Sequence, residues 1–427
     1  MRALRRLTAR DWIDSLAAFP LFIAAGPMPM KPTSPLFSSF GTTIFEVMSV
    51  MARAAGAVNL GQGFPDGRGP DDIRAAAADA LLNGHNQSPP MLGMPVLREA
   101  VAHHAQRFHG LTVDAAQQVI VSSGATEGLA ASLFGLLAPG DEAVVIEPAY
   151  DSYAPIIRQA GATVRTCRLA APGWQLERAT LEAAFSPRTK LLVLNNPHNP
   201  AGKVFSAAEL AVIADVVQRY DAYVVCDEVY EHLVFTPDRH IPLASLVGMA
   251  DRCVRIGSAG KTFALTGWKV GYVTCPPAVF ASIAKAHQYL TFTTPPNLQT
   301  AVAQGLAKDD AYFETLAAEL MAKRDRLAAG LARIGFTVLP AQGTYFLTVD
   351  AAAAGLGDDR AAAELLCKQA RVASVPLSAF YLEDPQTRYL RFCFCKDDAT
   401  LDEAISRLST FMARRAVTDR PLAAANT

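Results

Sequence analysis

The chain has 427 residues, of which 51% are hydrophobic, and 39 basic residues nearly balance 40 acidic ones. This length allows two domains with a sizeable core each, and the balanced charge argues against a nucleic-acid partner. No uninterrupted apolar run is long enough to span a bilayer. We therefore expect a cytoplasmic protein that acts on small molecules.

The seven cysteines are scattered and odd in number, and several stand in apolar, strand-like runs. This pattern favours buried free thiols in a reducing compartment over a disulfide framework. The eight histidines form no HExxH or CxxC-type cluster, so we expect no metal site.

The first 33 residues are set apart from the fold. Residues 1–15 carry four arginines and precede a short apolar run, as in a signal peptide, but Asp11 and Asp14 interrupt the pattern. Free thiols also fit export poorly. We interpret residues 1–33 as a disordered extension, or as the product of a start codon assigned too early.

Residues 67–305 alternate helical and strand-like segments. We expect a helix over 126–137, with leucines on one face, and another from Ser206, whose Glu209 has capping-box spacing. Strands are expected at 117–121, 143–146, 191–194, 223–226 and 254–256. They lack polar alternation, which is typical of a parallel sheet with helices on both faces. The sequence therefore predicts a large α/β domain.

The last third of the chain differs. Alanine-rich amphipathic helices are expected over about 310–335 and 360–371, with strands at 344–349 and 389–395. These elements predict a smaller α+β domain over 306–415. Residues 34–66 would form an N-terminal arm and complete this domain, and residues 416–427 would be a tail.

One lysine stands among small residues at the end of an apolar strand. Ser258 precedes Lys261 by three residues, and Lys269 follows it by eight. A lysine amine can form a Schiff base with an aldehyde, and the flanking groups suit a bound phosphate. Together they suggest covalently attached pyridoxal phosphate. A solvated lysine in a turn is the alternative, and this segment alone does not separate the two.

Polar residues also follow other predicted strands, where open α/β sheets bind their ligands. Residues 124–126 (Gly-Ala-Thr) join a strand to a helix start that favours phosphate, although an ordinary tight turn explains them equally well. Residues 61–63 (Gly-Gln-Gly) precede Phe-Pro and therefore fail the dinucleotide GxGxxG pattern.

Asp227 follows directly after an apolar strand, where a carboxylate needs a cationic partner or hydrogen bonds to stay ionised. A protonated pyridine nitrogen is one such partner, and a structural salt bridge is the alternative. Asn199 and Tyr230 can donate to a ring oxygen and Tyr150 can stack on an aromatic ring. Each of the three can equally be a loop or core residue.

Arg391 lies in the apolar strand 389–395, on the face of Cys393 and Cys395. A guanidinium in such a strand is costly unless it faces a carboxylate. The α-carboxylate of a substrate would satisfy this need, and so would an internal Asp or Glu.

Taken together, the chain resembles the fold-type I, class I/II aminotransferases. The likeness is greatest to the group of kynurenine aminotransferase, glutamine transaminase and methionine aminotransferase. It rests on five matching stretches in family order, which are highly specific as a set. These stretches are 59–66, 195–202, 226–230, 258–271 and 391–394.

This resemblance implies the fold-type I architecture, with a mostly parallel sheet of the seven-stranded type and a smaller α+β domain. Lys261 would hold pyridoxal phosphate as a Schiff base, and Asp227 would pair with the pyridine nitrogen. Asn199 and Tyr230 would bond the ring oxygen, while Tyr150 stacks on the ring. Lys261, Asp227 and Tyr230 would form the catalytic group.

The resemblance also implies ligands for the phosphate and for the substrate. The phosphate ligands would be Ala125, Thr126, Ser258 and Lys269. The substrate-binding residues would be Gly63, Asn199, Phe292 and Arg391. The family normally forms homodimers, so we expect one here.

The sequence departs from relatives at several positions. Ser88 stands where many relatives have a tyrosine that reaches the partner subunit's phosphate. Lys269 replaces an arginine common elsewhere in the superfamily. Residues 287–299 contain Phe292 but no arginine of the kind that binds a side-chain carboxylate. Aspartate is therefore not expected as the preferred substrate.

The predicted activity is transfer of an amino group from a large neutral L-amino acid to a 2-oxo acid. Methionine, glutamine, aromatic residues and kynurenine are the candidate donors. A cysteine-S-conjugate β-lyase using the same cofactor is an alternative, and a non-catalytic binding member of the fold is a remote one. Ser258 and Lys261 also match the Ser-x-x-Lys of serine acylases, but the chain lacks that family's Ser-Asp-Asn and Lys-Thr-Gly motifs.

Overall fold

The structure is a computed structural model that describes residues 31–237 and 239–418. The predicted extension 1–33 and tail 416–427 therefore lie mostly outside the described residues. The chain divides after Gly41 into two compact units. The described part of the first contains the short helix α2 (Pro35–Ser38). The second unit, from Thr42 onward, holds the sheets and the candidate site.

A seven-stranded sheet forms the centre of the second unit, in the order β2-β8-β7-β6-β5-β3-β4. β8 runs antiparallel to both of its neighbours, and every other adjacent pair is parallel. The predicted mostly parallel sheet is thus confirmed. Its strands are β2 (Val119–Ser123), β3 (Glu142–Glu147), β4 (Thr163–Arg168), β5 (Thr189–Asn195), β6 (Tyr223–Asp227), β7 (Cys253–Ser258) and β8 (Val270–Thr274).

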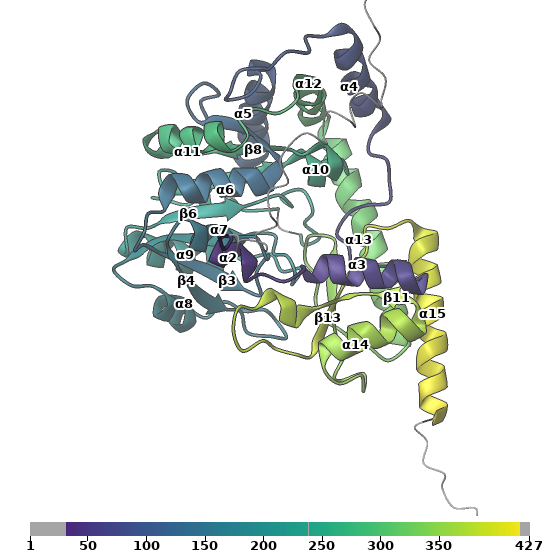
Figure 1. The fold of residues 1–427 in the computed structure, drawn as a ribbon. Helices are drawn as coiled ribbons and strands as arrows, with labels where there is room; N and C mark the ends of the chain where they lie inside the picture. Colours follow the sequence, from purple (N-terminus) through teal and green to yellow (C-terminus); the bar gives the residue numbers. More distant parts are fainter. Residues whose placement is uncertain (1–30, 238, 419–427) are drawn as a thin grey trace, which may run out of the picture. The chain divides into compact units, whose positions relative to one another are not determined.

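Helices cover both faces of this sheet, as Figure 1 shows. On β3, Ala143 and Val145 face one core and Val144 and Ile146 face the other, so alternate side chains are buried on opposite sides. The first face packs against α6 (Gly124–Leu136), α7 (Tyr153–Gln159) and α11 (Pro277–Leu290). The second packs against α8 (Arg178–Ala184) and α9 (Ala207–Arg219).

A further apolar cluster covers β2 and β8. Its helices are α4 (Asp71–Asn83), α5 (Pro95–His109) and α12 (Pro296–Leu306). The short helix α10 (Ala259–Thr262) follows β7 directly and carries Lys261.

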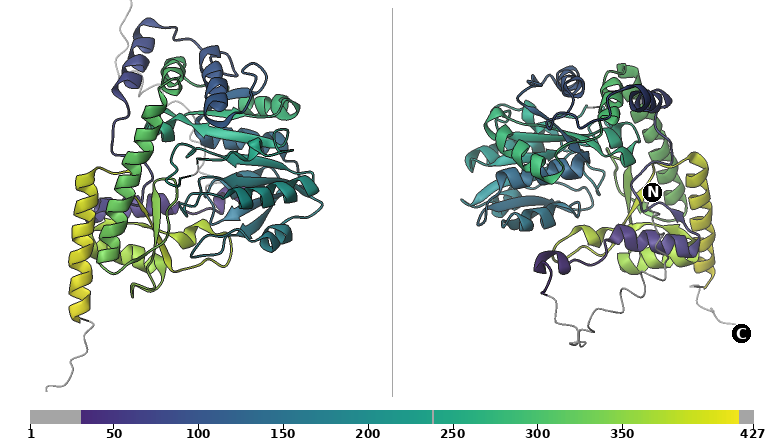
Figure 2. Two further views of the ribbon diagram at one scale, coloured as in Figure 1. Left: turned by 180° about the vertical axis from the view of Figure 1, so that it is seen from behind. Right: turned by 45° about the horizontal axis from the view of Figure 1, so that its top comes forward.

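The last third of the chain forms a four-stranded antiparallel sheet, in the order β12-β13-β10-β9. Its strands are β9 (Thr337–Val338), β10 (Phe346–Asp350), β12 (Val375–Pro376) and β13 (Tyr389–Cys393). The helices are α13 (Asp310–Arg333), α14 (Asp359–Leu365), which continues as the π-helical turn η3 (Leu366–Ala370), and α15 (Asp398–Thr418). Figure 2 shows α13 in green and α15 in yellow side by side.

The N-terminal arm packs into the same layer. Met48 and Ala52 of α3 (Ile44–Ala55) share a core with Leu327 and Phe392. Beyond α3, β1 (Val58–Asn59) pairs in parallel with β11 (Val372–Ala373). The division into domains 34–66, 67–305 and 306–415 stays a prediction.

All seven cysteines are free and buried, as predicted for those in the apolar strands. Across residues 31–237 and 239–418, no helix combines the length and the apolar character needed to cross a membrane.

The predicted capping box at the start of α9 is present. The Ser206 hydroxyl accepts the backbone N–H of Glu209 at 3.2 Å, and the Glu209 carboxylate accepts the backbone N–H of Ser206 at 3.0 Å. Ser206→Ala should lower the free energy of unfolding by about 1 kcal/mol, because an N-terminal donor of the helix loses its partner. Urea titration measures this change. Ser409→Ala, at an exposed position in α15, is the control, and an equal effect of both variants would contradict the account.

Candidate active site

A cavity of about 350 Å³ lies at the carboxyl-terminal edge of the large sheet. β2, β3, β5, β6 and β7 run in one direction, so the segments that follow them meet at this edge. The structure brings together eleven of the twelve predicted site residues as lining of this cavity. They are Gly63, Ala125, Thr126, Tyr150, Asn199, Asp227, Tyr230, Ser258, Lys261, Lys269 and Arg391.

Lys261 enters the cavity from α10, immediately after β7. Its Nζ donates to the Tyr345 hydroxyl at 2.8 Å, and that hydroxyl donates to the Gly63 carbonyl at 2.7 Å. Burial lowers the pKa of the Lys261 ammonium, which favours the neutral amine. A neutral amine is the form that attacks an aldehyde.

Asp227 ends β6, and its two carboxylate oxygens have different surroundings. Oδ2 accepts a hydrogen bond of 2.5 Å from the Tyr153 hydroxyl. Oδ1 is buried and has no hydrogen-bond partner within the described residues. Burial raises the pKa of Asp227 to about 6, against the opposing effect of the Tyr153 hydrogen bond. The predicted alternative, a structural salt bridge, is not formed with any cation that the structure describes.

The start of α6 forms a cradle with Lys269. Gly124 has a φ of 74°, and a Cβ built on it would stand 3.3 Å from Lys269 Nζ. A Cβ on Gly271 would stand 2.6 Å from the Gly124 carbonyl carbon, so Gly271 leaves no room for a side chain, and the positive φ of Gly124 disfavours one there. Ala125 and Thr126 follow in the first turn of this 13-residue helix, where backbone N–H groups lack intrahelical partners. This arrangement suits a phosphate.

Arg391 is 1% exposed in β13 and carries a charge with no acidic partner. Its Nη1 donates to Asn199 Oδ1 at 2.8 Å and its Nη2 donates to the Gly61 carbonyl at 2.7 Å, while Nε is buried without a partner. The guanidinium lies 3.9 Å from the centre of the Phe346 ring. Within residues 31–237 and 239–418, no Asp or Glu forms an ion pair with it, so the internal partner considered from the sequence is absent.

Phe292 is the predicted residue that this cavity does not include. It follows α11, has a φ of 67° and is 45% exposed. Ser88, at the position of the cross-subunit tyrosine, is also exposed. The roles assigned to Phe292 and to the other site residues stay predictions.

Several residues at the site were not predicted from the sequence. Tyr153 contacts Asp227, and Tyr345 contacts Lys261. Additional cavity-lining side chains include Phe45, Gln62, Asn195 and Phe346. For Tyr153 a signal was available, because it is a second tyrosine three residues after Tyr150, which was predicted to be at the site. For Phe45 and Gln62, no local pattern indicates that the N-terminal arm reaches this cavity.

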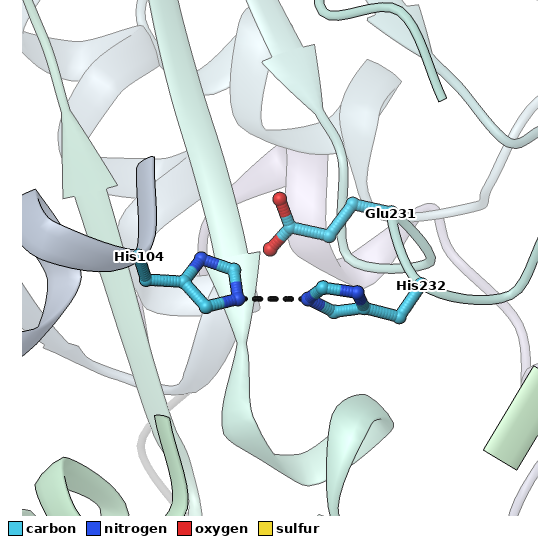
Figure 3. A group of neighbouring side chains, drawn as sticks. All are labelled: His104, Glu231 and His232. Atoms are coloured by element: carbon cyan, nitrogen blue, oxygen red, sulfur yellow. Dashed lines mark hydrogen bonds between the residues drawn. The ribbon is translucent and has the colours of Figure 1, made fainter. Parts of the chain in front are cut away.

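The fold also gathers histidines that are distant in the sequence. His104, Glu231 and His232 place one ligand atom each within 4.8 Å of one another (Figure 3). His104 Nε2 and His232 Nε2 share a hydrogen bond of 2.7 Å, and Glu231 Oε2 already accepts from His109 and Arg255. A cation would have to displace these partners beside a guanidinium. The geometry is that of a buried hydrogen-bond network, and the expectation of no metal site stays a prediction.

The donor set of the cavity fits pyridoxal phosphate. Lys261 offers an amine to the aldehyde, and the unpaired Oδ1 of Asp227 offers an acceptor to a protonated ring nitrogen. The cradle of Gly124 and Lys269 offers backbone donors and a cation to the phosphate.

Comparisons with known proteins agree with this donor set. Residues 55–408 match the family described as aminotransferase class I and II. The chain is 45% identical over 388 residues to a probable N-succinyldiaminopimelate aminotransferase, DapC, of Mycobacterium tuberculosis, which covers 88% of this chain and 98% of the relative. It is also 38% identical over 380 residues to methionine aminotransferase of Escherichia coli. This match covers 89% of this chain and 98% of the relative.

Solved structures give the same result. The N-succinyldiaminopimelate aminotransferase of M. tuberculosis has a TM-score of 0.86 over 89% of this chain and 100% of its own, at 45% identity. An E. coli structure with a methionine aminotransferase function has a TM-score of 0.87 at 38% identity. The match covers 90% of this chain and 100% of that chain. The chain therefore belongs to the fold-type I, class I and II aminotransferases, enzymes that use pyridoxal phosphate to act on amino acids and 2-oxo acids.

Proposed function

We propose that this aminotransferase moves the amino group of a large neutral L-amino acid, such as methionine, glutamine, an aromatic amino acid or kynurenine, to a 2-oxo acid. The observation that carries the proposal is Arg391, a buried guanidinium without an acidic partner on the same cavity as Lys261. A substrate α-carboxylate would neutralise it and bring the α-amino group toward Lys261.

Each residue of the site would have a separate role in the reaction. Pyridoxal phosphate supplies an aldehyde that takes up the amino group and a ring that accepts electrons from the α-carbon. Lys261 would anchor the cofactor and would serve as the general base for the α-proton of the substrate. Asp227 would hold the ring nitrogen in its protonated form, and Asn199 and Tyr230 would bond the ring oxygen.

The remaining residues hold the ring and the phosphate in place. Tyr150 would stack on the ring face. The phosphate would be held by Ala125, Thr126, Ser258 and Lys269, which line the same cavity.

The charge of the cavity supports a neutral substrate side chain. Among its described lining residues the cations are Lys261, Lys269 and Arg391, and the proposed roles occupy all three. Phe45 and Phe346 add apolar surface beside Arg391, and Phe64 also lines the cavity. A second substrate carboxylate therefore finds no further cation among the described lining residues, whereas an apolar or amide side chain finds suitable contacts.

N-succinyldiaminopimelate is a second candidate donor, because a relative at 45% identity carries the name of that activity. Its additional carboxylates would need cations beyond the three that line the cavity. The cations that line the cavity of this single chain therefore favour neutral donors over N-succinyldiaminopimelate. We also propose a homodimer, by resemblance, and a reducing, cytoplasmic location, supported by the free buried cysteines.

Lys261→Ala should lower turnover by roughly 10³-fold or more, because the covalent anchor and the general base are both lost. Absorption spectroscopy should also show loss of the borohydride-reducible visible band. Lys368→Ala, at an exposed lysine paired with Glu364, should behave like the wild type. An active Lys261→Ala enzyme would disprove the assignment.

Arg391→Gln should reduce kcat/KM for amino acids by roughly 10²-fold, since the carboxylate loses a charged, two-point partner. Steady-state kinetics measure this effect, which we expect mainly in KM. Arg388→Gln is the matched control, because Arg388 precedes the same strand but pairs with Asp350 at the surface. Equal losses in both variants would contradict a specific role of Arg391.

A panel of single amino acids against several 2-oxo acids should show higher kcat/KM for methionine, glutamine, aromatic amino acids or kynurenine than for aspartate. N-succinyldiaminopimelate belongs in the panel as the second candidate. Preference for aspartate or for the succinylated donor would overturn the proposed neutral class. Release of pyruvate and a thiol from cysteine conjugates without added 2-oxo acid would indicate β-lyase activity instead.

A further inference from the structure

We infer that Tyr153 is a positioning residue that holds one oxygen of Asp227 and thereby directs the other oxygen at the pyridine nitrogen of the cofactor. The inference rests on the proposed pairing of Asp227 with that nitrogen. It adds a residue that lies outside the cavity and acts through another side chain.

The contact between the two side chains is short and buried. The Tyr153 hydroxyl donates to Asp227 Oδ2 at 2.5 Å, and the two residues are 2% and 6% exposed. A hydrogen bond between a hydroxyl and a carboxylate is strong and directional, and few competing donors reach it in a buried site. With Oδ2 held in this way, Oδ1 is the carboxylate atom left without a partner.

The first turn of α7 accounts for this placement. Tyr153 begins the helix and packs in the core on one face of the large sheet, with Ile157 and Val225. Tyr150, three residues earlier, lines the cavity, and the two rings meet edge to face at 5.7 Å. One short segment thus offers one ring to the proposed cofactor face and a second ring to the carboxylate beneath it.

The hydrogen bond also affects the charge of Asp227. Burial raises the pKa of this carboxyl group to about 6, and donation from Tyr153 opposes the rise because it stabilises the carboxylate. Lys261 likewise favours the charged form, whereas Glu228 opposes it. The titratable groups facing Asp227 are Tyr150 before α7 and Tyr153 at its start, Glu228 and Tyr230 after β6, and Lys261 after β7.

The direction of the pH dependence of cofactor binding follows from the ionisation of Asp227. A protonated ring nitrogen pairs with the carboxylate, which is present above the pKa of Asp227 and is lost as the pH falls through it. Removing the Tyr153 donor raises this pKa further. Cofactor binding should therefore begin to weaken at a higher pH in a variant that lacks the hydroxyl.

Tyr153→Phe removes the hydroxyl and keeps the ring. We expect its apoenzyme to bind pyridoxal phosphate roughly tenfold more weakly near neutral pH, with a larger loss toward about pH 6. The ¹⁵N chemical shift of labelled pyridoxal phosphate should move toward that of a less protonated ring. Tyr272→Phe is the matched control, since its buried hydroxyl donates to the Glu231 carboxylate away from the cavity. Affinity, pH profile and ¹⁵N shift of the control should be those of the wild type.

A double-variant cycle with Asp227→Asn separates positioning from packing. If Tyr153 acts through the carboxylate, Tyr153→Phe should change cofactor affinity in the wild-type background and have little effect in the Asp227→Asn background. Equal effects in both backgrounds, or an unchanged ¹⁵N shift in Tyr153→Phe, would overturn the inference alone. If Asp227→Asn itself leaves the affinity and the ¹⁵N shift unchanged, the proposed pairing of Asp227 with the cofactor fails as well.

Discussion

The site depends on a buried cation that the fold does not neutralise. Among the described residues, Arg255 and Arg391 are buried arginines in strands, and their surroundings differ. Arg255 pairs with Glu228 at 2.6 Å and Glu231 at 3.2 Å, as a structural ion pair does. Arg391 instead has an amide oxygen, a carbonyl oxygen and an aromatic face. An uncompensated buried charge is expensive, so its retention beside Lys261 points to an anionic ligand rather than to stability.

The same contrast holds for the other polar groups of the cavity. Asp227 has one oxygen without a partner among the described residues, and Lys269 lies beside Gly124 at the start of α6, where backbone donors lack intrahelical partners. In the buried network of His104, His232 and Glu231, by comparison, each group has a partner. Buried atoms without a partner also occur elsewhere in the described structure, for example His109 Nδ1 and Trp174 Nε1. The candidate active site differs because its unpaired atoms, Asp227 Oδ1 and Arg391 Nε, belong to residues that line the same cavity as Lys261.

Much of this arrangement follows from local sequence patterns. Apolar runs predict the parallel strands. Asp227 is recognisable because it directly follows such a run, and Lys261 because it stands among small residues shortly after another. Parallel strands bring their carboxyl ends to one edge, so residues separated in the chain converge without any information about tertiary contacts. The capping box of Ser206 and Glu209 is equally local, and the structure contains it.

Contacts that depend on tertiary packing were not predictable in this way. Tyr345 reaches Lys261 across 84 residues, and His104 meets His232 across 128. Phe45 joins the cavity only because the N-terminal arm packs into the C-terminal layer. The role of Phe292 came from resemblance alone, and its exposed side chain lies outside the cavity of this chain.

The central claim is the covalent attachment of the cofactor to one amine, and mass spectrometry tests it most directly. The purified protein, incubated with pyridoxal phosphate and reduced with borohydride, should carry a single phosphopyridoxyl group on the peptide that contains Lys261. A protein that gains no such group, or that carries it reproducibly on another lysine, would contradict the account.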